Sequence, residues 1–148
     1  MSVKSSKYDR ALRMAQKKSS PSKAAYELLL AADKEGDSRA TYALATWYLH
    51  GSPFTPINKK RAVQLLKSAI KGGIADAARD LAVAYEVGDS VKKSPRLAFE
   101  SHMHAALLGH AQSFYEVGRM YFYGIGTPRN RRLAEHWLAK AETLGIKE

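Results

Sequence analysis

Apolar and small residues recur along the chain at helical spacing, and the whole pattern returns about every 36 residues. Ala62 and Ala69 are seven residues apart, which places them on one face of a helix. The columns that share this period are Tyr48/Tyr85/Tyr121, Gly51/Gly88/Gly124, Asn58/Ser94/Asn130, Ala62/Ala98/Ala134, Ala69/Ala105/Ala141 and Gly73/Gly109/Gly145. One step upstream lie Ala25, Ala32 and Gly36. Columns in register across three copies indicate a repeat protein.

Each repeat is predicted to be a pair of helices. The Asn58/Ser94/Asn130 column supplies N-cap residues, whose side-chain oxygens accept hydrogen bonds from free backbone N–H groups. The first helix of each pair ends at the glycine of the Gly51 column, and the second helix runs from the cap to the glycine of the Gly73 column. The expected fold class is therefore all-α, a right-handed α-solenoid of antiparallel helix pairs.

At 148 residues the chain is expected to form a single solenoid domain spanning residues 1–148. We expect a degenerate amino-terminal helix pair, or cap, over residues 1–37 and repeats over 38–74, 75–110 and 111–148. Tyr8, Leu12 and Ala15 are predicted to share one stripe of the first helix and to cover that end of the stack.

The repeat resembles the Sel-one-like repeat family, which is related to tetratricopeptide repeats. The pattern A-x-x-x-L-A-x-x-Y-x-x-G is seen in "ATYALATWYLHG" (40–51) and "AARDLAVAYEVG" (77–88), with Ser113 and Val117 as departures in the third copy. The second helix resembles A-x-x-W-x-x-K-A in "AEHWLAKA" (134–141), but Leu65 and Ser101 replace the tryptophan elsewhere. The family's usual loop aspartate is replaced by the Asn58/Ser94/Asn130 column. These changes retain the capping and packing roles.

The stretch "YFYGIGTPRNRR" (121–132) places Gly124 and Gly126 ahead of three arginines, as a phosphate-binding loop would. Such a loop follows a β-strand, and no strand is visible in this sequence. The two corresponding loops, after Gly51 and Gly88, lack the second glycine. We therefore interpret the stretch as the connection between two helices.

The resemblance implies a non-enzymatic scaffold or adaptor that binds a partner protein or peptide in a concave groove lined by the first helix of each pair. Aromatic residues and arginine, which are enriched at binding hot spots, are frequent on the expected groove face. The alternative is that these rings pack on a neighbouring helix. The predicted contacts are Tyr42, Thr46, Leu49, His50, Arg79, Val83, Glu86, Tyr115, Arg119, Phe122 and Tyr123. Some members of the family are immunity proteins for secreted toxins, which is a second possible role.

The net charge of +10 allows a third role, binding of RNA or an acidic protein. Residues 1–24 carry seven lysines and arginines, Lys4 and Lys18 among them, against one acid. A basic ridge is predicted from Lys60, Arg96 and Arg132, which recur every 36 residues. A solvated helix face is the simpler explanation of both features, and no aromatic residues alternate with these cations as single-strand binding requires.

Catalysis has little support in the sequence. The chain has no cysteine, which excludes disulfides and thiolate chemistry, and its five histidines show no metal-binding spacing. Ser101 and His104 lack an evident third partner for nucleophilic catalysis. We expect no catalytic residues, cofactor or metal ligands, no membrane association and a cytoplasmic location. Leu133, Trp137 and Leu138 have no following repeat to pack on, so either part of the carboxyl-terminal helix stays exposed or it meets another chain, as in a homodimer.

Overall fold

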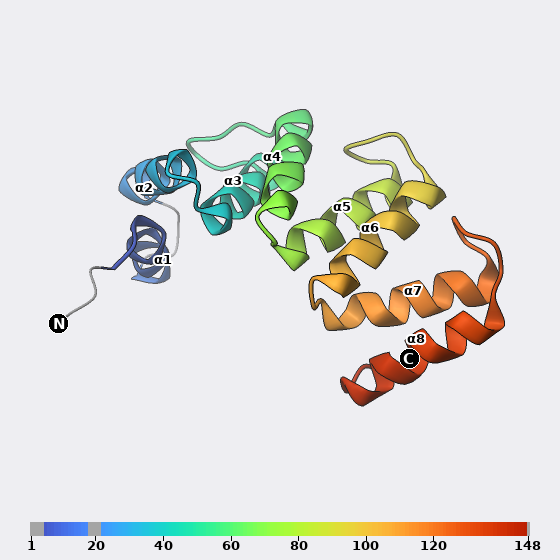
Figure 1. Ribbon diagram of the computed structural model, residues 1–148. Helices are drawn as coiled ribbons and strands as arrows, with labels where there is room; N and C mark the ends of the chain where they lie inside the picture. The colour runs from blue at the N-terminus through green and yellow to red at the C-terminus, as the bar shows by residue number, and fades with distance from the viewer. Residues whose placement is uncertain (1–4, 18–21, 148) are drawn as a thin grey trace. The chain divides into compact units, whose positions relative to one another are not determined.

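The structure is a computed structural model, and it describes residues 5–17 and 22–147. Within these ranges all regular secondary structure is α-helical (Figure 1). The helices are α1 (Lys7–Lys17), α2 (Lys23–Lys34), α3 (Ser38–His50), α4 (Lys59–Lys71), α5 (Ala75–Val87), α6 (Pro95–Leu107), α7 (Ala111–Tyr123) and α8 (Arg131–Thr143). The prediction of an all-α fold is confirmed.

The helices begin and end where the repeat columns predict. Asn58, Ser94 and Asn130 each accept a hydrogen bond from the backbone N–H three residues further on, at 3.0, 3.2 and 3.0 Å. The glycines after α4, α6 and α8 have φ values between 81° and 99°, a left-handed conformation that favours glycine. Side-chain caps and glycines therefore set the ends of the second helix in each pair.

Small residues form much of the core. Ala62, Ala98 and Ala134 are each 0% exposed, which lets neighbouring helices approach closely. Leu44 and Val117 of the predicted core column are also buried. The tyrosine column, by contrast, is only half-buried.

The chain divides into two compact units, Met1–Ile74 and Ala75–Glu148. In the first unit α1 packs on α2, α2 on α3 and α3 on α4. In the second unit α5 packs on α6, α6 on α7 and α7 on α8, and Figure 1 shows α7 and α8 running side by side. Each unit thus contains two consecutive helix pairs that are packed together.

The amino-terminal pair, α1 and α2, forms as predicted, but α1 is turned differently from the expectation. Ala11 is buried, the only side chain of α1 to be so among those from residue 7 to residue 15, whereas Leu12 is 45% exposed and Ala15 is exposed as well. Tyr8 is half-buried, with the guanidinium of Arg39 4.4 Å from its ring centroid. The predicted stripe of Tyr8, Leu12 and Ala15 is therefore wrong. The tyrosine stacks on an arginine, and the small alanine faces the neighbouring helix.

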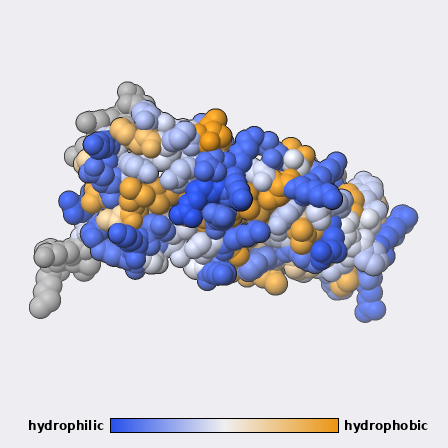
Figure 2. Space-filling view, turned by 90° about the horizontal axis from the view of Figure 1, so that it is seen from above, coloured by the Kyte–Doolittle hydropathy of each residue, from blue (hydrophilic) through white to orange (hydrophobic). Residues whose placement is uncertain are grey.

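Figure 2 shows a face on which hydrophilic residues predominate and hydrophobic residues form small patches. None of the helices in the described part of the chain is long and apolar enough to cross a membrane. Recognition through the face in view would rely on small apolar patches with polar surroundings.

Candidate functional site

A polar pocket of about 570 Å³ is lined by residues of α5, α6 and α7 in the second unit. The lining residues are Arg79, Val83, Glu86, His102, His110, Gln112, Glu116 and Arg119. Those of α5 are spaced four and three residues apart, and so are those of α7, so each set occupies one helix face. Two charged helix faces and one buried histidine thus meet at a single opening.

His102 lies at the base of this pocket and is only 2% exposed. Its Nε2 atom is 3.2 Å from Oε1 of Glu86, so the neutral tautomer with hydrogen on Nε2 donates to that carboxylate. Burial lowers the pKa of His102, and the nearby Glu86 and Glu116 carboxylates oppose this effect only in part. The imidazole is therefore uncharged at neutral pH. Its Nδ1 atom has no hydrogen-bond partner among the described residues.

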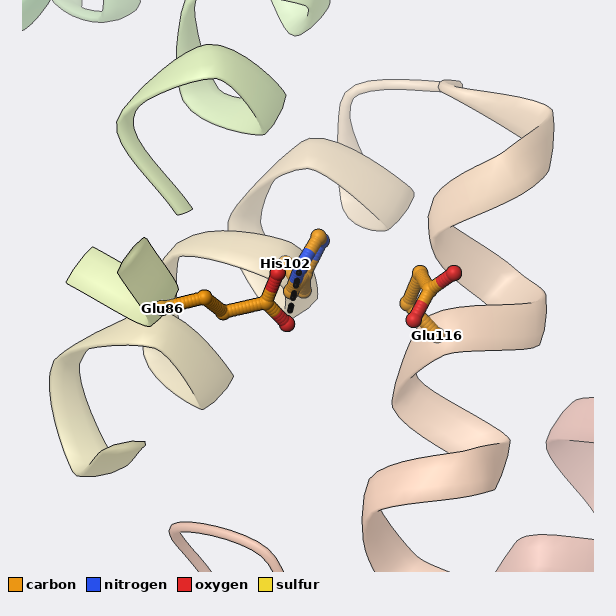
Figure 3. Close-up of side chains that lie close together, drawn as sticks. All are labelled: Glu86, His102 and Glu116. Carbon is orange, nitrogen blue, oxygen red and sulfur yellow. Dashed lines mark hydrogen bonds and ion pairs between the residues drawn. The ribbon is translucent and has the colours of Figure 1, made fainter. Parts of the chain in front are cut away.

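Arg119 connects the two glutamates that flank the histidine. Its Nε and one terminal nitrogen each lie 3.0 Å from Oε2 of Glu116, and the terminal nitrogen is 3.6 Å from Oε1 of Glu86. Figure 3 shows Glu86 in contact with His102, and Glu116 nearby on a different helix. One guanidinium therefore faces two carboxylates, which leaves the cluster with a net negative charge.

A second, smaller hollow of about 120 Å³ adjoins the pocket and is largely aromatic. Its lining residues are Tyr115, Arg119, Phe122, Tyr123 and Leu138. The rings of Phe122 and Tyr123 meet edge to face with centroids 4.9 Å apart, and Tyr123 is 65% exposed. The guanidinium of Arg131 lies 5.1 Å from the Phe122 ring centroid. Exposed aromatic rings beside arginines are the residue types common at binding hot spots.

A third hollow of about 420 Å³ extends onto α8 and the residues after it. It is lined by Tyr115, Leu138, Glu142, Ile146 and Lys147. Arg119 lines the first and second hollows, while Tyr115 and Leu138 line the second and third. The residues of the three hollows form one connected surface of the second unit, which we call the hollow strip.

The hollow strip contains seven of the eleven predicted groove residues. They are Arg79, Val83, Glu86, Tyr115, Arg119, Phe122 and Tyr123. The other four predicted residues lie on α3 in the first unit; they are Tyr42, Thr46, Leu49 and His50. That all eleven contact a partner stays a prediction.

Several residues of the strip were not predicted. His102, Glu116 and His110 belong to the polar pocket, and Leu138 and Glu142 come from α8. One signal was present in the sequence, because His102 is at the same repeat position as Leu66 and Leu138 and interrupts an apolar column. The close approach of Glu86 and Glu116 to His102 had no sequence signal, since it depends on three different helices.

The predicted basic ridge residues are all exposed. Lys60, Arg96 and Arg132 are the second residues of α4, α6 and α8, and Arg96 forms an ion pair with Glu100 at 2.7 Å. Lys60 belongs to the first unit and the two arginines to the second. A continuous ridge stays a prediction, as does dimerisation through α8, where Leu133 is 38% exposed. Lys4 and Lys18 of the basic amino-terminal segment lie outside the described residues.

The chain is similar to two proteins that are named as regulatory factors. It is 32% identical over 117 residues to chitin synthase regulatory factor 1 of Schizosaccharomyces pombe, and this similarity covers 78% of the chain but 24% of the relative. It is 31% identical over 90 residues to chitin synthase regulatory factor 2 of the same organism, covering 61% of the chain and 18% of that relative. The chain therefore spans about a quarter or less of the length of these relatives.

Solved structures give the same picture of the fold. A Sel1 repeat protein from Oxalobacter formigenes superposes with a TM-score of 0.75 at 33% identity, over 80% of this chain and 89% of that chain. A protective antigen of uropathogenic Escherichia coli with an SLR fold superposes with a TM-score of 0.83 at 26% identity, over 95% of this chain and 30% of the antigen. These similarities confirm the predicted helical-repeat solenoid. The Sel1 repeat pattern itself matches residues 38–74, 75–100 and 111–146, so the chain belongs to the Sel1 repeat family.

Proposed function

We propose that this Sel1 repeat protein is a non-catalytic adaptor that binds a partner protein or peptide along the hollow strip. The observation that carries the proposal is the connected set of three hollows in the second unit, which includes seven residues predicted from sequence as partner contacts. Helical-repeat proteins present such surfaces on rigidly packed helices, which reduces the entropy lost on binding.

The chemistry of the strip suits a peptide segment with one apolar anchor beside charged or polar side chains. The aromatic hollow has Phe122 and Tyr123 at its rim, and covering the exposed part of either ring contributes about 1–2 kcal/mol. Arg79 and Arg119 in the adjoining pocket offer hydrogen-bond donors to a carboxylate or a backbone carbonyl. Glu142 and Lys147 border the other end. The apolar contact supplies affinity and the polar contacts fix the direction of the bound segment.

A regulatory role for this adaptor is supported by its relatives. The two S. pombe proteins are named as regulatory factors of an enzyme, chitin synthase, and are 31–32% identical to this chain over the matched residues. We infer that this chain acts by holding another protein rather than by catalysis. An immunity protein that neutralises a toxin would use the same surface, and the identity of the bound partner distinguishes the two roles.

The experiment that tests the proposal is a pull-down with the tagged full chain from nuclease-treated lysate of the source organism. The wild type is compared with Phe122→Ala/Tyr123→Ala, and with Leu107→Ala as a matched control, because Leu107 is 72% exposed on α6 and lies outside the strip. We expect one stoichiometric protein that withstands a high-salt wash, is retained by the control and is lost from the double variant.

Two results would contradict the proposal. If the double variant retains the partner as well as the control does, the aromatic hollow is not the binding surface. If only nucleic acid or acidic proteins are recovered and are lost in high salt, the protein is a polyanion binder, because counterion release makes such binding steeply salt-dependent. The site would then be sought among the basic residues, beginning with Lys60, Arg96 and Arg132.

A further inference from the structure

Glu86, His102 and Glu116 form a compact cluster of possible metal ligands at the base of the polar pocket. One ligand atom from each residue lies within 4.8 Å of the other two. The three side chains come from α5, α6 and α7, as Figure 3 shows, so the cluster rests on three packed helices rather than on a loop. The histidine is 2% exposed, while the glutamate side chains are 32% and 22% exposed.

We propose that Glu86, His102 and Glu116 bind a single zinc ion. Zinc takes histidine nitrogen and carboxylate oxygen as ligands, at bond lengths of about 2.0–2.2 Å. Calcium and magnesium prefer oxygen ligands alone, so the buried imidazole disfavours them. Thiolate ligands are absent from the whole chain, which has no cysteine.

The geometry needs only small adjustments to hold the ion. In a tetrahedral site with these bond lengths, neighbouring ligand atoms are about 3.3 Å apart. The Nε2 atom of His102 and Oε1 of Glu86 are already separated by 3.2 Å. The other separations, of up to 4.8 Å, close by rotation of the partly exposed glutamate side chains, which for Glu116 requires breaking its hydrogen bonds with Arg119. The buried imidazole of His102 keeps its position while the glutamate side chains rotate.

The charges around the cluster favour a cation and also limit its affinity. The two carboxylates attract a divalent ion, whereas the guanidiniums of Arg119 and Arg79, which line the same pocket, oppose it. Arg119 competes for the same carboxylates, because it is already hydrogen-bonded to Glu116. Histidine ligands of zinc usually donate their second N–H to an acceptor, and Nδ1 of His102 has none among the described residues. We therefore expect a dissociation constant for zinc on the order of micromolar rather than nanomolar.

The site is open rather than closed. Three protein ligands leave one tetrahedral position for water, as in zinc sites that exchange ligands. Both glutamates and His102 line the 570 Å³ pocket, which gives an ion a route of entry from solvent.

The test is isothermal titration of zinc chloride into the purified full chain after treatment with a chelator. We expect one ion per chain, and at least tenfold weaker binding in Glu86→Gln and in Glu116→Gln. Glu100→Gln and His104→Gln serve as matched controls, because these α6 side chains are exposed and lie outside the cluster. Cobalt(II) provides an independent readout, since a tetrahedral site gives intense visible absorption that the glutamine variants would lose.

Arg119→Gln tests the same site with a variant that should strengthen zinc binding rather than weaken it. Because this variant removes a competing cation while keeping both carboxylates, zinc should bind about fivefold more tightly. Circular dichroism establishes that each variant is folded. The proposal is overturned if the folded wild type shows no saturable binding at zinc concentrations up to about 100 µM, which is well above the expected dissociation constant. It is also overturned if the glutamine variants of Glu86 and Glu116 bind as well as the controls do.

Discussion

The carbonyl oxygen of Pro95 lies 2.0 Å from the position that a Cβ atom would take on Gly126. Gly126 also has a φ of 70°, which other L-residues adopt only with strain. The loop before α8 therefore packs its second glycine directly against the first residue of α6. This contact accounts for the residue that distinguishes this loop from the loops after Gly51 and Gly88, without any role for a phosphate.

Replacing Gly126 by alanine should strongly destabilise the fold. The backbone strain costs about 1 kcal/mol, and the clash with a backbone carbonyl raises the total to about 3 kcal/mol or more. Gly145→Ala is the matched control. Gly145 has a φ of 81°, but nothing lies within 4 Å of the position that its Cβ would take. This variant should therefore lose only the stability that the backbone strain costs. Urea unfolding of both variants measures the difference, and equal losses would contradict the role of the contact.

The cap of α8 offers a second test of the repeat pattern. Asn130 accepts a hydrogen bond from the backbone N–H of Leu133 at 3.0 Å. Asn130→Ala should lower the free energy of unfolding by about 1 kcal/mol, whereas Asn130→Ser, which has the residue found at Ser94, should cost only a few tenths. A serine variant as unstable as the alanine variant would show that the column has another function.

The cap of α3 should make stability depend on pH. Hydrogen bonds from the Arg39 side chain lower the pKa of Asp37, the N-cap residue, with further help from the Arg39 backbone N–H. A pKa that is lower in the folded state means that the unfolded state binds the proton more readily. This contribution is therefore present above the ordinary aspartate pKa and is lost as the pH falls through the lower, folded-state value.

Asp37→Asn isolates this effect, because asparagine keeps the cap but carries no charge. At pH 7 the free energy of unfolding of the wild type should exceed that of the variant by up to about 1 kcal/mol. This difference should shrink as the pH falls below about 4. Thermal unfolding at several pH values measures it. Acidic residues that do not contact Arg39 are present in both proteins and cancel in the comparison, and Asp9, which is 3.5 Å from Arg39, is replaced by asparagine in both. A difference that is constant with pH would contradict the assignment.

The His102→Leu variant distinguishes a structural role of His102 from a role as a zinc ligand. Leucine is present at its repeat position in Leu66 and Leu138, so His102→Leu should pack without a large cavity. The variant also removes a buried nitrogen that has no partner, and its stability should equal or exceed that of the wild type by about 1 kcal/mol. Zinc affinity should nevertheless fall at least tenfold. A large loss of stability would instead identify the hydrogen bond between His102 and Glu86 as a structural requirement.

Much of the fold was predictable because local chemistry sets it. Capping side chains, terminal glycines and buried alanines repeat in the sequence, so helix ends could be placed within a residue or so at Asn58 and Gly124. The orientation of α1 was not predictable, since it depends on Tyr8 stacking on Arg39 from a helix that is remote in sequence. Such contacts leave no periodic signal.

The candidate site was predictable only where it lies on the repeat columns of the first helices. Phe122 and Tyr123 follow from helical spacing, and the structure places them at a hollow. The part of the strip on α8, which includes Leu138 and Glu142, depends on how α8 packs against α7. The Glu86–His102–Glu116 cluster likewise requires three helices to be packed before its ligands meet.

The central claim, that the hollow strip holds a partner protein, is tested most directly by site-specific photocrosslinking. A photoreactive phenylalanine analogue replaces Tyr123 in the strip or Leu107 outside it, both of which are well exposed. After irradiation in native lysate, we expect one prominent crosslinked protein from position 123 and none from position 107, and Phe122→Ala should weaken the crosslink. Equal crosslinking at both positions, or crosslinking at position 107 alone, would contradict the claim.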